Sequence, residues 1–255
     1  MTDRAAECAH RWNFKPTEQL ESGHCSHIYA TNDRVLKVPF QGEELASGFV
    51  AALRIAGNLG PNVIEADSES GVVLMDRIHP GTTLGANGLN DAECQALVTG
   101  FIRQLQPLPT EGCLPLDQYF EEPDPLLDEL TRTSPAKVFL HGDLHHGNIL
   151  RNEEAWTVID PKGLVGDPHY EPIAFLRNPY AWLATVSDLL SLIRARILRF
   201  AEDLNLDPWR IAAWGLIDSK PNPDTDPTSP WGRLPLVYQI LVSEFPRPSG
   251  SPEGR

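Results

Sequence analysis

His141-Gly-Asp-Leu-His-His-Gly-Asn148 is the stretch of sequence that decides the fold, and Asp160 follows it twelve residues later. The stretch holds a carboxylate, Asp143, and an amide, Asn148, five positions apart. Between it and Asp160, the polar run Arg151-Asn-Glu-Glu154 is typical of a turn. We therefore expect a loop that leads into a short hairpin, with Asn148 and Asp160 on opposite sides of that hairpin.

The spacing of these polar residues is that of the protein-kinase catalytic loop, His-x-Asp-x-x-x-x-Asn, with Gly142 where protein kinases carry Arg. Phosphoryl transfer needs charge neutralisation and an aligned nucleophile. Asp143 stands where a carboxylate would orient an acceptor hydroxyl and take its proton. Asn148 and Asp160 offer the kind of oxygen ligands that Mg²⁺ shares with phosphates. The pattern thus predicts Asp143 as catalytic base, and Asn148 and Asp160 as metal ligands.

Three histidines in the stretch, His141, His145 and His146, leave two rival interpretations open. A dinuclear metallohydrolase prefers His-x-His-x-Asp-His, whereas the order here is His-x-Asp-x-His-His. A non-haem iron site would use His141 and Asp143 as two ligands of a facial triad, and it needs a distant third histidine. His169 follows closely and lies in a Gly-Asp-Pro turn. We therefore expect His141 to brace the loop by hydrogen bonds rather than to bind a metal.

Lys37 lies upstream in the β-rich run Arg34-Val-Leu-Lys-Val-Pro-Phe40, where it is predicted to hold nucleotide phosphates. Its acidic partner is expected at the start of the next helical stretch, where Glu44 is favoured over Glu43. The run Glu21–His27 precedes the first strand, and its backbone N–H groups are expected to cover the phosphates. The residues named for that cover are Ser22, Gly23 and His24.

The order of elements predicts an α+β fold of the protein-kinase-like bilobal kind. We expect a small N-terminal lobe, residues 1–78, with an antiparallel sheet that binds nucleotide. We expect residues 79–255 to form a larger, mainly helical lobe for catalysis and substrate binding. Asp76 and Ile78 lie where the last strand of the first lobe runs out. Their backbone either hydrogen-bonds an adenine edge or forms a simple crossover.

Finer helix predictions follow from hydrophobic periodicity and from capping residues. A short helix is expected near residues 16–20, and two longer ones over Tyr180–Leu204 and Pro208–Ile217. Asp207 is a predicted N-cap of the last of these, because a proline follows it at the first helical position.

The composition narrows the class of partner. The chain of 255 residues has a formal net charge of −14, which argues against nucleic acid as a partner and is compatible with a cationic small-molecule substrate. Its four cysteines form no Cys-x-x-Cys pair, so a zinc knuckle is not expected. The N-terminus lacks the apolar region of a secretory signal, and residues 173–193 carry too many polar groups for a membrane span. We expect a cytoplasmic monomer or dimer without a membrane partner.

Together these residues resemble the aminoglycoside phosphotransferase superfamily of small-molecule kinases, whose catalytic loop is similar to residues 141–150. Further segments are similar to the streptomycin 6-phosphotransferase and hydroxyurea phosphotransferase branch of that superfamily. They are Ile159-Asp-Pro-Lys-Gly163, Gly166-Asp-Pro168, Tyr170-Glu171, Phe175-Leu-Arg-Asn-Pro179 and Leu206–Trp214. The resemblance covers most of residues 20–217.

The resemblance implies ATP or GTP, together with Mg²⁺, as cofactors. It implies that Lys162, two positions after Asp160, reaches a phosphate or the substrate. Glu171 and Asn178 either line the acceptor pocket or cap helices. We therefore expect an ATP-dependent O-phosphotransferase acting on a small-molecule hydroxyl, with an aminoglycoside such as streptomycin as acceptor and antibiotic resistance as the role. Two alternatives stay open: a kinase of a sugar or amino-alcohol metabolite, and a catalytically weak nucleotide-binding protein.

Overall fold

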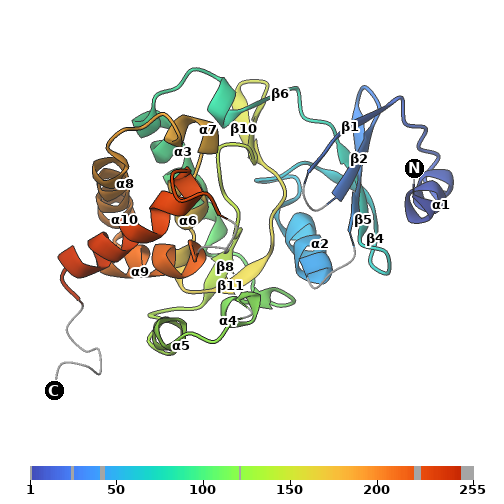
Figure 1. Ribbon diagram of the computed structural model, residues 1–255. Coiled ribbons are helices and arrows are strands. Elements are labelled where there is room, and N and C mark those ends of the chain that lie inside the picture. Colours follow the sequence, from blue (N-terminus) through green and yellow to red (C-terminus); the bar gives the residue numbers. More distant parts are fainter. Residues whose placement is uncertain (1, 24–25, 41–43, 121, 221–224, 248–255) are drawn as a thin grey trace.

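A five-stranded antiparallel sheet forms one end of the protein in the computed structural model (Figure 1). Its strand order is β1-β2-β3-β5-β4. The strands are β1 (Glu18–Gly23), β2 (Ser26–Ala30), β3 (Arg34–Pro39), β4 (Val63–Asp67) and β5 (Val72–Asp76). The structure describes residues 2–23, 26–40, 44–120, 122–220 and 225–247.

The alternation of side chains along β3 decides which of them face the rest of the protein. Leu36 and Val38 are fully buried and belong to the small core under α1 (Asp3–Arg11), which covers the outer face of the sheet (Figure 1). Because successive side chains of a strand point to opposite faces, Lys37 lies on the inner face. Its register neighbours are Ile28 on β2 and Val73 on β5, so it lies in the middle of the sheet.

Helix α2 (Glu44–Ile55) lies between the sheet and the remainder of the chain (Figure 1). Ser47 of α2 donates through Oγ to the carbonyl oxygen of Lys162 at 2.8 Å. Gly163 makes this approach possible, because a Cβ there would lie 2.3 Å from the Ser47 carbonyl oxygen and its φ is +69°. The helix that follows the nucleotide-binding strand is thus fixed directly against the segment after Asp160.

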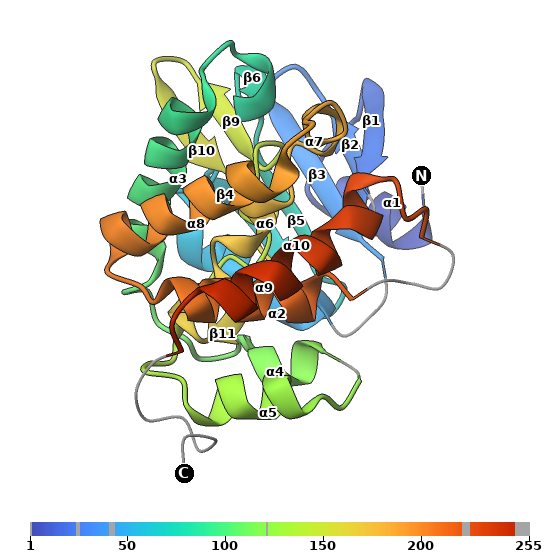
Figure 2. The same ribbon diagram turned by 60° about the vertical axis from the view of Figure 1, so that its left-hand side comes forward.

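The larger part of the chain is mainly helical and surrounds a single large core that contains Trp214, Phe175 and Ile102. Figure 2 shows α8, α9 and α10 side by side on one face, with α4 and α5 below them. The helices are η1 (Leu84–Ala86), α3 (Asp91–Leu105), α4 (Leu116–Tyr119), α5 (Pro125–Arg132), η2 (Pro168–Tyr170), α6 (Ile173–Leu176), α7 (Tyr180–Leu183), α8 (Leu189–Leu204), α9 (Pro208–Asp218) and α10 (Pro230–Glu244).

Two small sheets lie among these helices and carry the decisive stretch. One has the order β10-β9-β6, with β6 (Pro80–Thr83), β9 (Ile149–Asn152) and β10 (Ala155–Val158). The other has the order β7-β11-β8, with β7 (Leu114–Pro115), β8 (Val138–Leu140) and β11 (Leu164–Gly166). The predicted hairpin after Asn148 is therefore confirmed as β9 and β10, which pair antiparallel.

Capping decides where the finer predictions succeed or fail. Asp207 caps α9 as predicted, since its carboxylate accepts from the N–H of Arg210 at 3.1 Å. The single helix predicted over residues 180–204 is wrong, because Asp188 accepts from the N–H of Ser191 and starts α8 as a separate helix. The helix predicted near residues 16–20 is wrong as well. That segment enters β1, where Leu20 pairs with Ile28.

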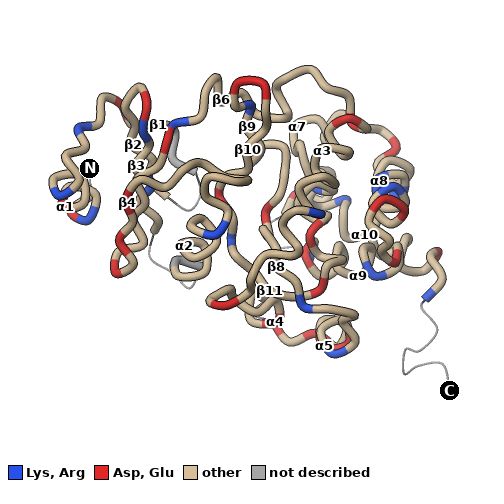
Figure 3. Tube along the Cα trace, turned by 180° about the vertical axis from the view of Figure 1, so that it is seen from behind, with Lys and Arg blue, Asp and Glu red and all other residues tan. Residues whose placement is uncertain are grey.

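Positions of Lys and Arg alternate with positions of Asp and Glu along much of the described trace (Figure 3). None of the helices in the described ranges is both long enough and apolar enough to cross a membrane.

Candidate active site

The loop between β8 and β9 carries the predicted catalytic residues and is held by its own hydrogen bonds. Its turn begins at Gly142, with φ +78°, where a Cβ would lie 2.8 Å from the side chain of Leu164. The carbonyl oxygen of Asp143 accepts from the N–H of His145 at 3.0 Å and from Nδ2 of Asn148 at 2.9 Å. The spacing of five between Asp143 and Asn148 therefore closes the loop on itself.

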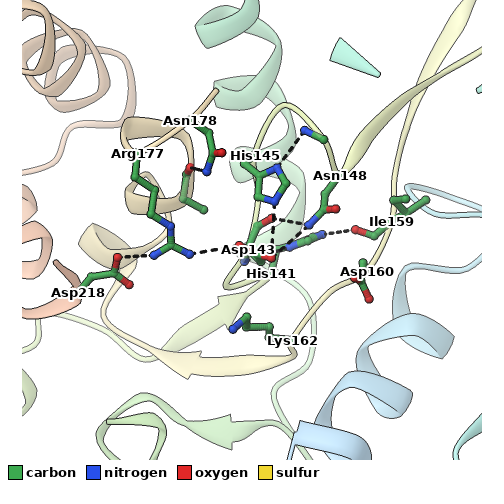
Figure 4. A network of polar contacts seen from close by, with 12 residues as sticks. His141, Asp143, His145, Asn148, Ile159, Asp160, Lys162, Arg177, Asn178 and Asp218 are labelled. Atoms are coloured by element: carbon green, nitrogen blue, oxygen red, sulfur yellow. Dashed lines mark hydrogen bonds and ion pairs between the residues drawn. The ribbon is translucent and has the colours of Figure 1, made fainter. Parts of the chain in front are cut away.

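His141 anchors this loop to the strand that leads to Asp160. Its Nε2 lies 3.0 Å from the carbonyl oxygen of Ile159, and its Nδ1 lies 3.3 Å from the N–H of Asp143, which donates to it (Figure 4). Complete burial lowers the pKa of His141 to about 4, so the ring is neutral at physiological pH. Both ring nitrogens are engaged with backbone, which is the bracing role expected of this residue.

His146 joins the same loop to the helical core. It is buried, and its ring stacks on Phe175 of α6 with 4.4 Å between the centroids. Burial lowers its pKa to about 3, and Arg196 nearby adds to that effect. Within the described ranges, no group of three or more His, Cys, Asp or Glu side chains gathers as a metal-binding cluster. The observed contact of His146 is therefore its packing against Phe175.

The Asp143 carboxylate is held at both of its oxygens. Oδ1 lies 3.3 Å from Nη2 of Arg177, and Oδ2 lies 3.3 Å from Nδ2 of Asn148 (Figure 4). Nε2 of His145 lies 3.7 Å from Oδ2, but burial lowers the pKa of His145, so this ring is mainly neutral. The side chain of Asp143 keeps 23% of its surface exposed, so a small molecule can still reach it.

Lys37 and Asp160 contact each other directly across the space between the two parts of the chain. The Lys37 ammonium donates to the Asp160 carboxylate. Burial alone would raise the pKa of Asp160, but the charge and hydrogen bond of Lys37 outweigh it, with help from the charge of Lys162, and the pKa is lowered. Asp160 is therefore ionised at neutral pH. It is also a non-glycine residue with φ +61°, a conformation that turns its side chain out of the strand direction.

Asn148, Asp160 and Lys37 line one cleft of about 420 Å³. The carbonyl oxygen of Asn148 accepts from the N–H of Ile159 at 2.9 Å. Asn148 therefore lies beside the residue that directly precedes Asp160. Apolar side chains from the large sheet and from the β9–β10 hairpin form the remaining walls; they include Ile28, Val35, Val63, Met75, Leu150 and Ile159. The part of the cleft formed by Lys37, Asn148 and Asp160 is called its polar end below; Asp76 and Arg77 also line the cleft.

The backbone segment predicted to meet an adenine edge lines the same cleft, at Asp76 and Ile78. The N–H of Asp76 donates to the carbonyl oxygen of Asn62 at 3.0 Å, and Asn62 in turn donates from its side chain to the Asp76 carboxylate. The Asp76 N–H is therefore engaged within the protein, which leaves its carbonyl as the group that could face a base.

Lys162 contacts the catalytic loop through its backbone and α4 through its side chain. Its backbone N–H donates to the carbonyl oxygen of His141 at 2.8 Å, and its ammonium contacts the Tyr119 hydroxyl of α4. The ammonium also lies 4.6 Å from the centre of the Tyr119 ring. Tyr119 is a neighbour that nothing in the local sequence pattern indicated.

Glu171 is buried, whereas Asn178 is partly exposed. Glu171 is 1% exposed, and its Oε2 accepts from the N–H of Gly142 at 3.5 Å. Burial raises its pKa to about 8, so it is mainly protonated at neutral pH. Nδ2 of Asn178 donates to the carbonyl oxygen of Ala174 at 2.9 Å, which caps the end of α6. Asn178 was expected either to line the acceptor pocket or to cap a helix, and the contact it makes is the capping one. A contact between Glu171 and an acceptor molecule conflicts with the burial of Glu171.

Arg177 is the site residue that the sequence did not single out. It lies in the run Phe175-Leu-Arg-Asn-Pro179, yet its importance depends on two acids from distant segments, Asp143 and Asp218. Only the fold brings these together, so no local pattern could have found it.

Several residues predicted to contact the nucleotide lie outside the described residues, or in elements whose side chains are not described there. His24 lies outside the described residues. Ser22 and Gly23 belong to β1, and Glu44 is the first residue of α2, but their side chains are not among those described. Their predicted roles stay predictions.

Comparison with known proteins shows which proteins this chain is similar to. Residues 124–219 match the family model for aminoglycoside/hydroxyurea antibiotic resistance kinases. The chain is 27% identical over 240 residues to a streptomycin 6-kinase of Streptomyces griseus, covering 83% of this chain and 78% of that protein. It is 28% identical over 212 residues to a hydroxyurea phosphotransferase of Kitasatospora aureofaciens, covering 71% and 62%.

A solved structure extends the likeness to the whole fold. A thermostable mutant of aminoglycoside phosphotransferase APH(4)-Ia, in ternary complex with ADP and hygromycin B, superposes with a TM-score of 0.56 at 16% identity. The match covers 95% of this chain and 98% of that one. It confirms the predicted α+β, kinase-like fold class, while the boundary between lobes after residue 78 stays a prediction.

Proposed function

We propose that the chain transfers the γ-phosphate of ATP to a hydroxyl group of an aminoglycoside such as streptomycin. The comparisons support this, because they relate the chain to the streptomycin 6-phosphotransferase and hydroxyurea phosphotransferase branch of the aminoglycoside phosphotransferase superfamily. That it is a small-molecule phosphotransferase follows from these relatives. The nucleotide, the metal ion, the acceptor and the residue roles are the parts proposed here.

The observation that carries the proposal is the common cleft of Lys37, Asn148 and Asp160, with Asp143 on the same loop as Asn148. A flat base fits between the apolar walls, and the carbonyl of Asp76 and the N–H of Ile78 would meet its polar edge. Lys37 stands at the polar end of the cleft, where triphosphate oxygens would lie. The volume of about 420 Å³ is within the range of small-molecule sites.

The donor set at the polar end fits Mg²⁺. An ionised carboxylate, Asp160, and an amide oxygen, Asn148, are hard oxygen ligands, and Mg²⁺ usually takes only one or two such groups from a protein. When bound, the ion would neutralise charge on the phosphate oxygens. The contact of Lys37 with Asp160 keeps the carboxylate ionised, and it is made to Oδ1, so a cation would bind at Oδ2.

Asp143 would act on the acceptor. As the acceptor oxygen forms a bond to the γ-phosphorus, the bond from that phosphorus to the bridging oxygen breaks, and its electron pair leaves with ADP. The hydroxyl proton goes to Asp143. This needs an exposed, oriented carboxylate, which the 23% exposure and the two hydrogen bonds of Asp143 provide.

A pair of aromatic rings lies beside Arg177, the residue that contacts this carboxylate. Trp231 of α10 lies 5.7 Å from the Arg177 guanidinium and stacks on Tyr180 of α7, with 6.0 Å between the ring centroids. Both remain more than a third exposed. They offer a flat wall for a cyclitol or sugar ring, so we assign them to the acceptor side. A role in antibiotic resistance and a cytoplasmic location belong to the same proposal.

A transfer assay tests the function. Purified protein with Mg·ATP or Mg·GTP is offered streptomycin, other aminoglycosides, hydroxyurea and hydroxylated metabolites, and phosphorylated products are detected by phosphorus NMR. The proposal expects a phosphorylated aminoglycoside. Transfer only to a sugar or an amino alcohol would favour the metabolite kinase, and nucleotide binding without any transfer would favour the catalytically weak binding protein.

A further inference from the structure

We propose that Arg177, anchored by Asp218, is a positioning residue that fixes the Asp143 carboxylate for the acceptor hydroxyl. The proposal deepens the phosphotransfer function and rests on Asp143 as its base. It gives a role to Arg177, at the end of α6, and to Asp218, at the end of α9. Neither carried a role in the catalytic-loop pattern.

The first argument is the geometry around the carboxylate. Arg177 donates to Oδ1 and Asn148 donates to Oδ2, both at 3.3 Å, from opposite sides of Asp143 (Figure 4). A carboxylate held at both oxygens cannot rotate freely about its last side-chain bond. Asn148 is also a proposed metal ligand. Arg177, in contrast, contacts Asp143 and has no proposed role in binding the nucleotide or its metal ion.

The second argument is the anchoring of the guanidinium itself. Its Nη1 donates to Oδ2 of Asp218, while Oδ1 of Asp218 accepts from the Tyr170 hydroxyl at 2.9 Å. The side chains of Arg177 and Asp218 are only 15% and 7% exposed. The indole of Trp231 lies on the guanidinium at 5.7 Å. Arg177 thus reaches Asp143 from a fixed base and not as a mobile surface side chain.

The third argument is the rigid backbone that presents Arg177. Arg196 of α8 is 2% exposed and is paired with Asp91 of α3. Its Nη1 donates to three carbonyl oxygens around Arg177, those of Phe175, Leu176 and Asn178. One buried arginine therefore fixes the turn from which the other extends.

Arg177 keeps a negatively charged partner in both protonation states of the base. Burial would lower the pKa of Arg177, but Asp218 outweighs it and the pKa is raised, so the guanidinium stays charged and takes no proton. When Asp143 receives the hydroxyl proton, Arg177 is still paired with Asp218. No buried charge is left without a partner. Within the described residues that contact Asp143, His145 is mainly neutral and Arg177 is the charged one.

Steady-state kinetics test the role, with Mg·ATP and the acceptor on which the wild-type chain is active. Arg177→Met should lower kcat by about 100-fold, the usual cost of a misplaced catalytic group, and leave the KM for ATP within about threefold. Arg177→Lys should recover part of kcat, and guanidinium chloride at low concentration should partly rescue Arg177→Met. The matched control is Arg194→Met on α8, whose surface pair with Glu244 lies outside the site and whose kcat should not change.

Asp218→Asn tests the anchor separately. It should lower kcat less than Arg177→Met does, and the double variant should be no slower than Arg177→Met alone, because both changes act through one contact. A kcat of Arg177→Met within threefold of wild type would overturn the proposal. So would equal losses of kcat, ATP affinity and thermal stability without rescue, since those indicate a purely structural role.

A crystallographic comparison separates this proposal from the proposed function. Without any acceptor, the wild-type carboxylate of Asp143 should have one orientation, and Arg177→Met should show two or more. An identical single orientation in both would contradict positioning by Arg177, even if the acceptor had been identified. Absence of transfer by the wild type with every acceptor would count against the function alone.

Discussion

The ammonium of Lys37 and the carboxylate of Asp160 are hydrogen-bonded, although 123 residues separate them in the sequence. The contact joins the middle of the large sheet to the end of the β9–β10 hairpin. It brings together the cation proposed for phosphates and the carboxylate proposed for the metal ion. The polar end of the cleft is therefore assembled from both parts of the chain.

Lys37→Met should weaken the binding of a non-hydrolysable ATP analogue with Mg²⁺ by about 10- to 100-fold, because a charge-assisted contact to the phosphates is lost. Isothermal titration calorimetry measures the effect. Lys15→Met, at an exposed position that does not line the cleft, is the control and should bind as wild type does. Unchanged affinity in Lys37→Met would remove Lys37 from the nucleotide site.

Gly163→Ala should destabilise the chain by at least about 3 kcal/mol, because the new methyl group would collide with the Ser47 carbonyl oxygen as well as strain a left-handed backbone. Gly88→Ala is the matched control. Gly88 also has a positive φ, of +86°, but a Cβ there meets no atom within 4 Å. Its cost should be the strain alone, about 1–2 kcal/mol. Equal losses in urea unfolding would show that the contact with α2 contributes little.

Glu171 should make stability fall as pH rises. Its pKa is about 8 in the folded chain, against 4.5 as its ordinary value. The folded state therefore binds more protons between these values, and the contribution is full below about pH 4.5 and is lost as pH rises through about 8. Glu171→Gln keeps a neutral group at this position, so the Tm of the variant should decline less than that of the wild type between pH 5 and pH 9. Each kcal/mol of stability that is lost should lower the Tm by about 2–4 °C.

The control for this experiment is Glu154→Gln, whose side chain is fully exposed in the hairpin turn. Its melting curve should follow that of the wild type at every pH. If Glu171→Gln lost Tm with pH as steeply as the wild type, the buried carboxyl would not be the source of the decline.

Trp231→Ala should raise the KM for the acceptor about five- to tenfold and leave the KM for ATP unchanged, because the proposed wall for the acceptor ring is removed. Trp156→Ala, at a tryptophan on the β9–β10 hairpin away from Arg177, is the comparison variant. A change in the KM for ATP, or none for the acceptor, would place Trp231 outside the acceptor site.

The parts of the site that the sequence predicted are local ones. Asp143, Asn148 and the hairpin toward Asp160 depend on turn chemistry and on spacing within twenty residues, so their pattern is visible before folding. Lys37 was predictable because an apolar β-rich run surrounds it. The capping of α9 by Asp207 is local in the same sense.

The parts that the sequence did not predict depend on pairs of distant residues. Arg177 and Asp218 are 41 positions apart, and Arg196 and Asp91 are 105 apart. Such pairs form only after the helices pack, and no local sequence pattern identifies the distant acid with which an arginine will pair. The strand at residues 18–23 was not predicted for a similar reason: its pairing with β2 outweighs the local preference for a helix.

The proton-accepting role of Asp143 is the central claim, and the rate of transfer by Asp143→Asn measures it most directly. The substitution keeps the size of the side chain and removes its ability to take the hydroxyl proton. We expect kcat to fall by about 10²- to 10⁴-fold with Mg·ATP affinity within about threefold of wild type. Transfer at the wild-type rate by a folded Asp143→Asn protein would contradict the account.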